Sequence, residues 1–280
     1  MTKAPSSLDP SHQPSVMLFH RAVARGSCPS YTGGMARPIL ARPFVFMAFA
    51  MLALAAGEPE SGPDVVRPTV QLRNSEKRGS GTIIASVAGD TLILTAAHVV
   101  KGASDLTVEL HRHNLGYSST GLTEGGGWPR LVKAKVVAAD PDGDVALVRV
   151  GGMVALPHVA RFDPSAALPA RGDVLTSVGI DRTLFLTRWR TSVQGTAMID
   201  IHQGDGGPRP FTVVTRYPEH GRSGGGLFRA DGAVVGVCTG QLSLKPGTPK
   251  VGVFASVVSI RRLLEGQGLV KAAATPAGKP

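Results

Sequence analysis

One serine in this sequence lies on a glycine-rich stretch with a positive charge beside it. Residues 220–228 read "HGRSGGGLF", so Ser223 follows Arg222 and precedes three glycines. A serine hydroxyl on a tight turn becomes a nucleophile when a nearby base accepts its proton. The same letters also fit a flexible Gly/Ser loop that carries no chemistry. The rest of the chain has to decide between these interpretations.

The positions of the histidines exclude one class of serine hydrolase. In α/β-hydrolases the nucleophile lies in a G-x-S-x-G turn, and the acid and the histidine of the triad follow it along the chain. The sequence offers no alternation of strands and helices of the kind that fold needs. None of the eight histidines follows the serine; they are His12, His20, His98, His111, His113, His158, His202 and His220.

A catalytic triad that contains Ser223 must therefore follow the order histidine, aspartate, serine along the chain. His98 lies in "LTAAHVV", at the end of an apolar run, where a strand would deliver it to the edge of a cleft. Asp144 opens "DVALVRV", at the start of a buried strand, where a carboxylate shielded from water can orient an imidazole. Asp140 and Asp142 in "DPDGD" compete for this role, but their place in a turn suits them better to capping it.

Composition and charge argue for a globular protein without a nucleic-acid surface. Apolar residues make up 42%, enough for a core, and 35 glycines with 21 prolines suit many short strands joined by turns. The net charge is +10, but the basic residues are scattered and aromatics are only 5%. We expect weak attraction to anionic surfaces and no nucleic-acid partner. No Cys, His and carboxylate spacing indicates a metal site, and no cofactor is expected.

The N-terminus has the composition of an export signal. Residues 44–56, "FVFMAFAMLALAA", are uncharged and apolar, and are shorter than the ~20 residues that span a bilayer. Starting at residue 35 gives ordinary signal-peptide proportions, so 35–56 is predicted to be a signal peptide and 1–34 a disordered extension or mis-assigned start. The protein is then periplasmic or extracellular. The alternative is an uncleaved membrane anchor at 44–56. Only Cys238 remains if Cys28 is removed, so no internal disulfide is expected.

The remainder reads as all-β. From about residue 66, twelve short β-rich runs alternate with turn residues, which favours antiparallel barrels or a sandwich. One helix is predicted near 257–266, because Val257, Ile260, Leu263 and Leu264 share one helical face and a glycine follows them. Residues 267–280 are predicted to be a disordered tail.

Taken together, these segments resemble the chymotrypsin-type, trypsin-like serine proteases, and among them the HtrA-like bacterial branch. The resemblance rests on "GSGTIIA", "LTAAHVV", "DVALVRV" and "GRSGGGLF" and covers about 78–258. It implies two antiparallel Greek-key β-barrels, about 66–160 and 170–258, within a domain of 66–266. No PDZ module is expected, and the oligomeric state stays open.

The resemblance also implies roles for individual residues. Ser223 would attack the scissile carbonyl, His98 would accept and return the proton, and Asp144 would hold the imidazole tautomer. The backbone N–H groups of Gly221 and Ser223 would form the oxyanion hole.

The substrate pocket departs from the family pattern. Tyr217 stands where an acid would select Lys or Arg, so we expect a modest apolar pocket; the positions implied to bind substrate are Tyr217, His220, Val237, Cys238, Thr239 and Gly240.

Arg222 is the main departure. Trypsin proper has an acid there that pairs with a newly cut N-terminus, and an arginine cannot form that pair. We expect Arg222 to be exposed. The sequence therefore predicts an exported serine endopeptidase that acts on protein or peptide substrates; the alternative is an inactive protease fold that serves as a binding module.

Overall fold

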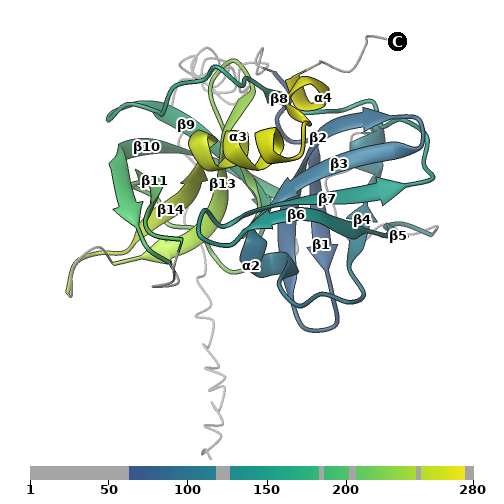
Figure 1. Ribbon diagram of the computed structural model, residues 1–280, viewed down its shortest axis with the longest axis horizontal. Coiled ribbons are helices and arrows are strands. Elements are labelled where there is room, and N and C mark those ends of the chain that lie inside the picture. The colour runs from purple at the N-terminus through teal and green to yellow at the C-terminus, as the bar shows by residue number, and fades with distance from the viewer. Residues whose placement is uncertain (1–62, 118–126, 183–185, 202–205, 244–246, 275–280) are drawn as a thin grey trace, which may run out of the picture. The chain divides into compact units, whose positions relative to one another are not determined.

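The computed structural model describes residues 63–117, 127–182, 186–201, 206–243 and 247–274. These residues form two sheets of seven strands each, which follow one another along the chain and are antiparallel apart from one short parallel pairing in the second (Figure 1). The predicted extension at 1–34 and the predicted signal peptide at 35–56 lie outside the described residues. Within the described part of the chain, no helix is long and apolar enough to cross a membrane.

The first sheet is built from short strands whose inward side chains are aliphatic. Its order is β5-β4-β1-β2-β3-β7-β6, so β4 returns beside β1 and β7 lies beside β3. Among the described residues its edge strands β5 and β6 do not pair with each other, so it curves into a half-barrel. The strands are β1 (Thr69–Arg73), β2 (Arg78–Val87), β3 (Asp90–Thr95), β4 (Thr107–Leu110), β5 (Arg130–Lys133), β6 (Lys135–Asp140) and β7 (Val145–Gly151).

The second sheet closes on itself. β12 pairs with β9 on one side and β13 on the other, so six strands form a ring in the order β9-β10-β11-β14-β13-β12, and β8 adds to β13 in parallel. Buried phenylalanines fill it, among them Phe211, Phe228 and Phe254. The strands are β8 (Arg161–Phe162), β9 (Val174–Ile180), β10 (Leu186–Ile199), β11 (Arg209–Val214), β12 (Gly226–Phe228), β13 (Ala233–Leu242) and β14 (Val251–Ser256). The predicted fold class of a trypsin-like double barrel is confirmed.

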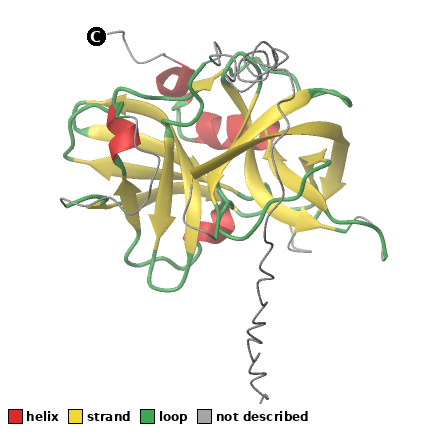
Figure 2. Cartoon of the chain, turned by 180° about the vertical axis from the view of Figure 1, so that it is seen from behind, coloured by secondary structure: helices red, strands yellow, loops and turns green. Residues whose placement is uncertain are grey.

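The predicted C-terminal helix is present and joins the two sheets. Helix α3 (Val257–Gly266) follows β14 directly and buries Val257, Ile260, Leu263 and Leu264, the face that the sequence indicated. It packs against β6 and β7 of the first sheet and against β11, β13 and β14 of the second. The helix therefore lies between the two sheets in both views (Figures 1 and 2).

The prediction of a disordered tail from residue 267 is wrong for its first part. The chain forms a short helix, α4 (Val270–Ala274), after a reversal at Gly268, which has φ +65°. The N–H of Leu269 donates to the Leu264 carbonyl at 2.9 Å, which closes the end of α3. Ala273 is 1% exposed, so this segment docks because a small apolar side chain fits the core, a contact that tail composition does not reveal. Residues 275–280 lie outside the described residues.

Candidate active site

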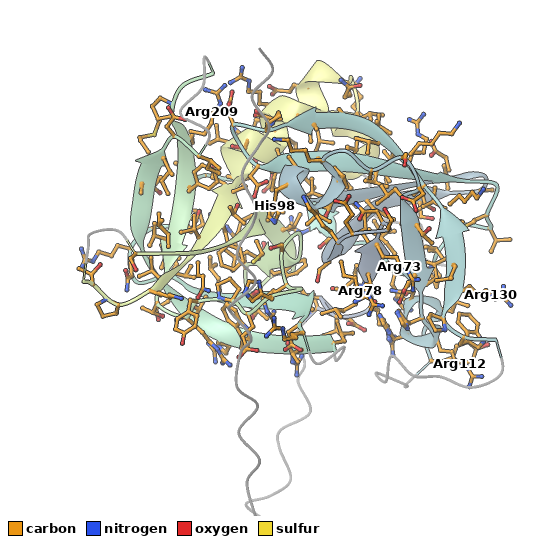
Figure 3. All side chains as sticks on the ribbon, turned by 90° about the horizontal axis from the view of Figure 1, so that it is seen from below. Arg73, Arg78, His98, Arg112, Arg130 and Arg209 are labelled. Carbon is orange, nitrogen blue, oxygen red and sulfur yellow. The ribbon has the colours of Figure 1, made fainter. Side chains whose placement is uncertain are left out.

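His98 and Asp144 come from the first sheet. The sequence placed His98 at a strand end; it lies one step later, on the short helix α2 (Ala97–Val100), which begins two residues after β3 ends at Thr95. Asp144 directly precedes β7. Because β3 and β7 are antiparallel neighbours, with Thr95 opposite Ala146, the end of one strand lies beside the start of the other. In Figure 3 His98 lies between the two sheets.

The two side chains form a close pair. Both carboxylate oxygens of Asp144 lie 3.0 Å from His98 Nδ1, and the backbone N–H of His98 also donates to Oδ1 at 3.0 Å. Asp144 is 1% exposed, whereas the His98 side chain is 40% exposed. A carboxylate is an acceptor, so Nδ1 carries the proton in the neutral ring and Nε2 is left as the basic nitrogen.

Asp140 and Asp142, the two aspartates that competed with Asp144 in the sequence, have other partners. Asp140 accepts the N–H of Gly143 at 3.2 Å, which caps the turn before β7. Asp142 forms an ion pair with Arg209 at 3.4 Å. Asp144 itself has φ +48°, the left-handed region that aspartate tolerates better than most residues. Of these three described aspartates, Asp144 alone pairs with His98.

Glycines bring the Ser223 turn against the first sheet. A Cβ at Gly224, which has φ +88°, would lie 2.0 Å from the Ser80 carbonyl oxygen and 3.1 Å from the Ala96 nitrogen. A Cβ at Gly79 would lie 2.7 Å from the Val99 side chain and 2.9 Å from the Ser223 carbonyl oxygen. The turn that carries Ser223 thus packs directly against β2 and the segment around His98. A side chain at position 79 or 224 would not fit between them.

The Ser223 hydroxyl has a backbone acceptor in this state. Its Oγ donates to the Thr239 carbonyl at 3.3 Å, and within the described residues it forms no hydrogen bond with His98 Nε2. Hydrogen bonds between nucleophile and base are often long before substrate binds. Thr239 is the extra residue of a bulge in β13, between Cys238 and Gly240, which turns its carbonyl towards the serine.

Ser80 of β2 holds the turn from the opposite sheet. Its N–H donates to the Ser223 carbonyl at 2.7 Å. Its hydroxyl donates to the Gly221 carbonyl at 2.9 Å and accepts the N–H of Ile180 at 2.8 Å. Ser80 is fully buried, so both residues that flank Arg222 are tied to one rigid point.

Gly221 has the conformation that a tight turn requires. The Arg222 N–H donates to the Glu219 carbonyl at 3.3 Å, and Gly221, at the third position of this turn, has φ +93°. A type II turn needs this φ, and a Cβ there would lie 3.0 Å from the Ile180 carbonyl oxygen. Within the described part of the chain, the N–H groups of Gly221 and Ser223 have no protein acceptor. Two such donors can stabilise an oxyanion.

The expectation that Arg222 is exposed is wrong: it is 1% exposed. Its guanidinium donates to Ser177 Oγ at 3.2 Å, to the Thr187 carbonyl at 3.3 Å and to the Thr187 hydroxyl. It also lies 4.8 Å from the centre of the Trp189 ring. The neighbouring strands β9 and β10 supply these partners, and their aromatic face and neutral acceptors make burial tolerable.

Comparison with known proteins identifies the family. A family model described as a trypsin-like peptidase domain matches residues 79–237, more than half of the chain and the whole of the site above except Thr239. The chain belongs to the trypsin-like peptidase family.

A curated relative lies in the HtrA-like branch, in agreement with the sequence resemblance. Serine protease Do-like HtrA of Bacillus subtilis (strain 168) is 30% identical over 182 residues, which are 59% of this chain and 34% of that protein. This trypsin-like peptidase therefore spans about a third of the length of the relative it matches.

Solved structures share the fold. An HtrA-type protease, AlgW with a tripeptide, superposes with a TM-score of 0.55 at 22% identity, over 74% of this chain and 61% of that one. The serine endoprotease from Yersinia pestis gives a TM-score of 0.53 at 21% identity, over 74% of this chain and 65% of that one. At these identities the likeness concerns the fold alone.

Two of the six positions expected to bind substrate are unsuited to it. Val237 and Cys238 are 1% and 0% exposed, and their backbones are bonded to β14 on one side and to Gly224–Gly226 on the other. The prediction is therefore wrong for direct contact with these two residues. From Thr239 onward β13 pairs with β14 alone among the described residues, so its other edge is open beside Ser223.

The remaining substrate positions lie near the turn. His220 is exposed, and Tyr217 is 51% exposed. Tyr217 does not line an apolar pocket; it borders a pocket of about 670 Å³ whose walls include Arg216, Glu219 and Arg222. The sequence analysis expected an apolar pocket next to Tyr217, whereas the pocket in the structure has charged walls.

Sequence reasoning missed Ser80 and Trp189 as parts of the site. The segment "GSG" at 79–81 contributed only to the family resemblance. Glycines within a strand, however, often mark a place where another segment of backbone packs closely against it. Trp189 stands between two exposed arginines on β10, and this alternation marks it as inward-facing.

We predict that Ser80→Ala slows acylation of Ser223. The substitution leaves the buried Ile180 N–H without its acceptor and frees the Gly221 carbonyl, so the free energy of unfolding falls by about 1–3 kcal/mol. The rate of labelling by a fluorophosphonate falls about tenfold or more because the oxyanion turn loses its anchor. Ser86→Ala is the matched control, since Ser86 is also on β2 and accepts a backbone N–H, from Leu156, at 2.8 Å. Equal labelling rates in the two variants would contradict this role.

Cys238 gives a pH-dependent prediction. Burial raises the pKa of Cys238 from 9.0 to about 12, so the folded state keeps its thiol proton where the unfolded state loses it. Stability from this group is complete below the unfolded value and declines as pH rises above it. Relative to Cys238→Ala, we expect the wild type to lose about 1.4 kcal/mol of unfolding free energy between about pH 8 and about pH 10 in urea denaturation. A stability difference independent of pH would show that the thiol is not shielded.

Proposed function

We propose that this protein is a serine endopeptidase that hydrolyses peptide bonds through His98, Asp144 and Ser223. The observation that carries the proposal is the buried Asp144 carboxylate paired with His98 Nδ1, next to the glycine turn of Ser223 in a chain of the trypsin-like peptidase family. The pairing leaves His98 Nε2 free of a proton, as a general base requires.

The reaction takes two steps. The Ser223 Oγ leaves its contact with the Thr239 carbonyl and attacks the scissile carbonyl carbon while its proton passes to His98 Nε2. The tetrahedral intermediate places its negative oxygen at the N–H groups of Gly221 and Ser223. His98 then gives the proton to the leaving amine as the C–N bond breaks, which leaves an acyl-enzyme. Water then attacks the ester carbonyl carbon while its proton passes to His98 Nε2, and His98 gives that proton to Ser223 Oγ as the ester C–O bond breaks and the acid leaves.

The open edge of β13 supports a peptide as substrate. An extended peptide could add to the free backbone of residues 239–242 as one more antiparallel strand, with its scissile bond carried past Ser223. Thr239 and Gly240 then contact the substrate backbone, and His220 and Tyr217 lie close enough to contact side chains.

Labelling with a fluorophosphonate tests the proposal directly. We expect the wild type to be labelled and Ser223→Ala not to be. His98→Ala and Asp144→Asn lower the labelling rate by about 10⁴-fold, because each leaves the serine without a correctly oriented base.

Asp142→Asn is the matched control for Asp144→Asn, because its carboxylate pairs with Arg209 instead, and its labelling rate is expected to stay at the wild-type level. A well-folded wild type that is not labelled would overturn the proposal and favour the binding module.

We also propose that the protein is exported, on the strength of the apolar segment at 44–56 preceded by Arg37 and Arg42. The mature chain is then expected to begin near residue 57. Mass-spectrometric mapping of the N-terminus of protein isolated from its own cells checks this. Peptides from before residue 50 retained in the mature protein would contradict cleavage.

A further inference from the structure

Arg222 is buried without an ion-pair partner among the described residues. Its three hydrogen bonds all go to neutral acceptors on Ser177 and Thr187, and no carboxylate within the described residues forms an ion pair with it. Burial is the main cause that lowers the pKa of Arg222. Burying a cation without an ion-pair partner costs free energy. Binding of an anion next to Arg222 would lower that cost.

A second cation faces the same aromatic ring. The Arg216 guanidinium lies 5.0 Å from the centre of the Trp189 ring, close to the 4.8 Å of Arg222. Arg216 is exposed, and its positive charge adds to the lowering of the Arg222 pKa. Two like charges on one indole repel each other, and an anion between them would relieve that repulsion.

The pocket of about 670 Å³ behind the Ser223 turn gives access to both arginines. Arg188 and Trp189 also line it, and Asp181 and Glu219 contribute two carboxylates. These carboxylates raise the Arg222 pKa by less than burial lowers it, so they offset its charge only in part. Asp181 also accepts a hydrogen bond from the Thr187 hydroxyl at 3.1 Å.

We propose that this pocket binds a carboxylate group between Arg216 and Arg222. A guanidinium has five N–H donors in a planar fork, and the three hydrogen bonds of Arg222 use at most three of them. Arg216 carries a second planar fork, and carboxylates match such forks through two parallel charge-assisted hydrogen bonds. The carboxylate can come from a small free acid or from the C-terminus of a peptide.

Occupancy would act on the candidate active site. Arg222 lies between Gly221 and Ser223, and Glu219 at the other end of the turn also borders the pocket. A bound carboxylate holds Arg222 in place and so stabilises the conformation in which the Gly221 N–H is available. This regulatory effect rests on the proposed peptidase function, whereas binding does not.

Intrinsic fluorescence measures binding without using activity. The chain has two tryptophans, so full-length Trp128→Phe Ser223→Ala protein reports on Trp189 alone and cannot turn over. We expect sodium acetate at constant ionic strength, balanced with sodium chloride, to change the emission saturably. A short peptide with a free C-terminus is the second probe, and the same peptide as its C-terminal amide is its control.

Variants locate the binding site. In the same background Arg216→Gln should weaken binding about tenfold or more, and Arg216→Lys less, because lysine keeps the charge but not the fork. Arg190→Gln, an equal loss of charge from an exposed position on β10 outside this pocket, should bind like the parent.

Saturation by acetate alone identifies a small acid as the ligand, and saturation by the acid peptide but not its amide identifies a chain terminus. No saturable change with either probe, an equal effect of chloride, or unchanged affinity in Arg216→Gln overturns the proposal.

Activity gives the regulatory test separately. In Ser223-intact protein, the saturating carboxylate should raise the rate of fluorophosphonate labelling several-fold, and Arg216→Gln should abolish the increase. If the carboxylate binds but the labelling rate does not increase, the regulatory effect is overturned and the proposed binding site still stands. Absence of labelling under all conditions would instead overturn the proposed function.

Discussion

The geometry of the candidate active site depends on hydrogen bonds that Ser80 makes across the boundary between the two sheets. The buried hydroxyl joins the end of β9 to the turn before Ser223, and the Ser80 N–H holds the Ser223 carbonyl. His98 and Asp144 lie next to strands β3 and β7 of the sheet that contains Ser80, whereas Ser223 lies in the turn before β12 of the other sheet. A serine on β2 therefore fixes where Ser223 lies relative to His98, and the close approach requires glycine at 79 and 224.

Arg222 shows a different solution to the problem of ordering an oxyanion turn. The side chain next to the nucleophile must be fixed, and an ion pair with a new chain terminus is one way to fix it. Here a guanidinium is held by an indole face and neutral oxygens. This arrangement leaves a positive charge buried away from water, and the polar contacts compensate for it only in part.

The β-rich runs predicted an all-β chain, and the resemblance of the segments around His98, Asp144 and Ser223 to trypsin-like proteases implied the double barrel and the pairing of His98 with Asp144. The surroundings of Arg222 could not be predicted in this way. Its partners are set by the register of β9 against β10 and β12, in which Ser177 lies opposite both Trp189 and Leu227. Local residue types do not encode that register. The burial of Val237 and Cys238 likewise depends on pairing with strands on both sides.

The position of α3 has a consequence for biosynthesis. The helix follows all the described strands in sequence, and it packs on β7 of the first sheet and on β13 and β14 of the second. On a ribosome the first sheet can form early, but α3 cannot hold it to the second sheet until residues up to 266 have emerged. Docking of the two sheets through α3 is therefore a late event in synthesis, after the described strands have been made.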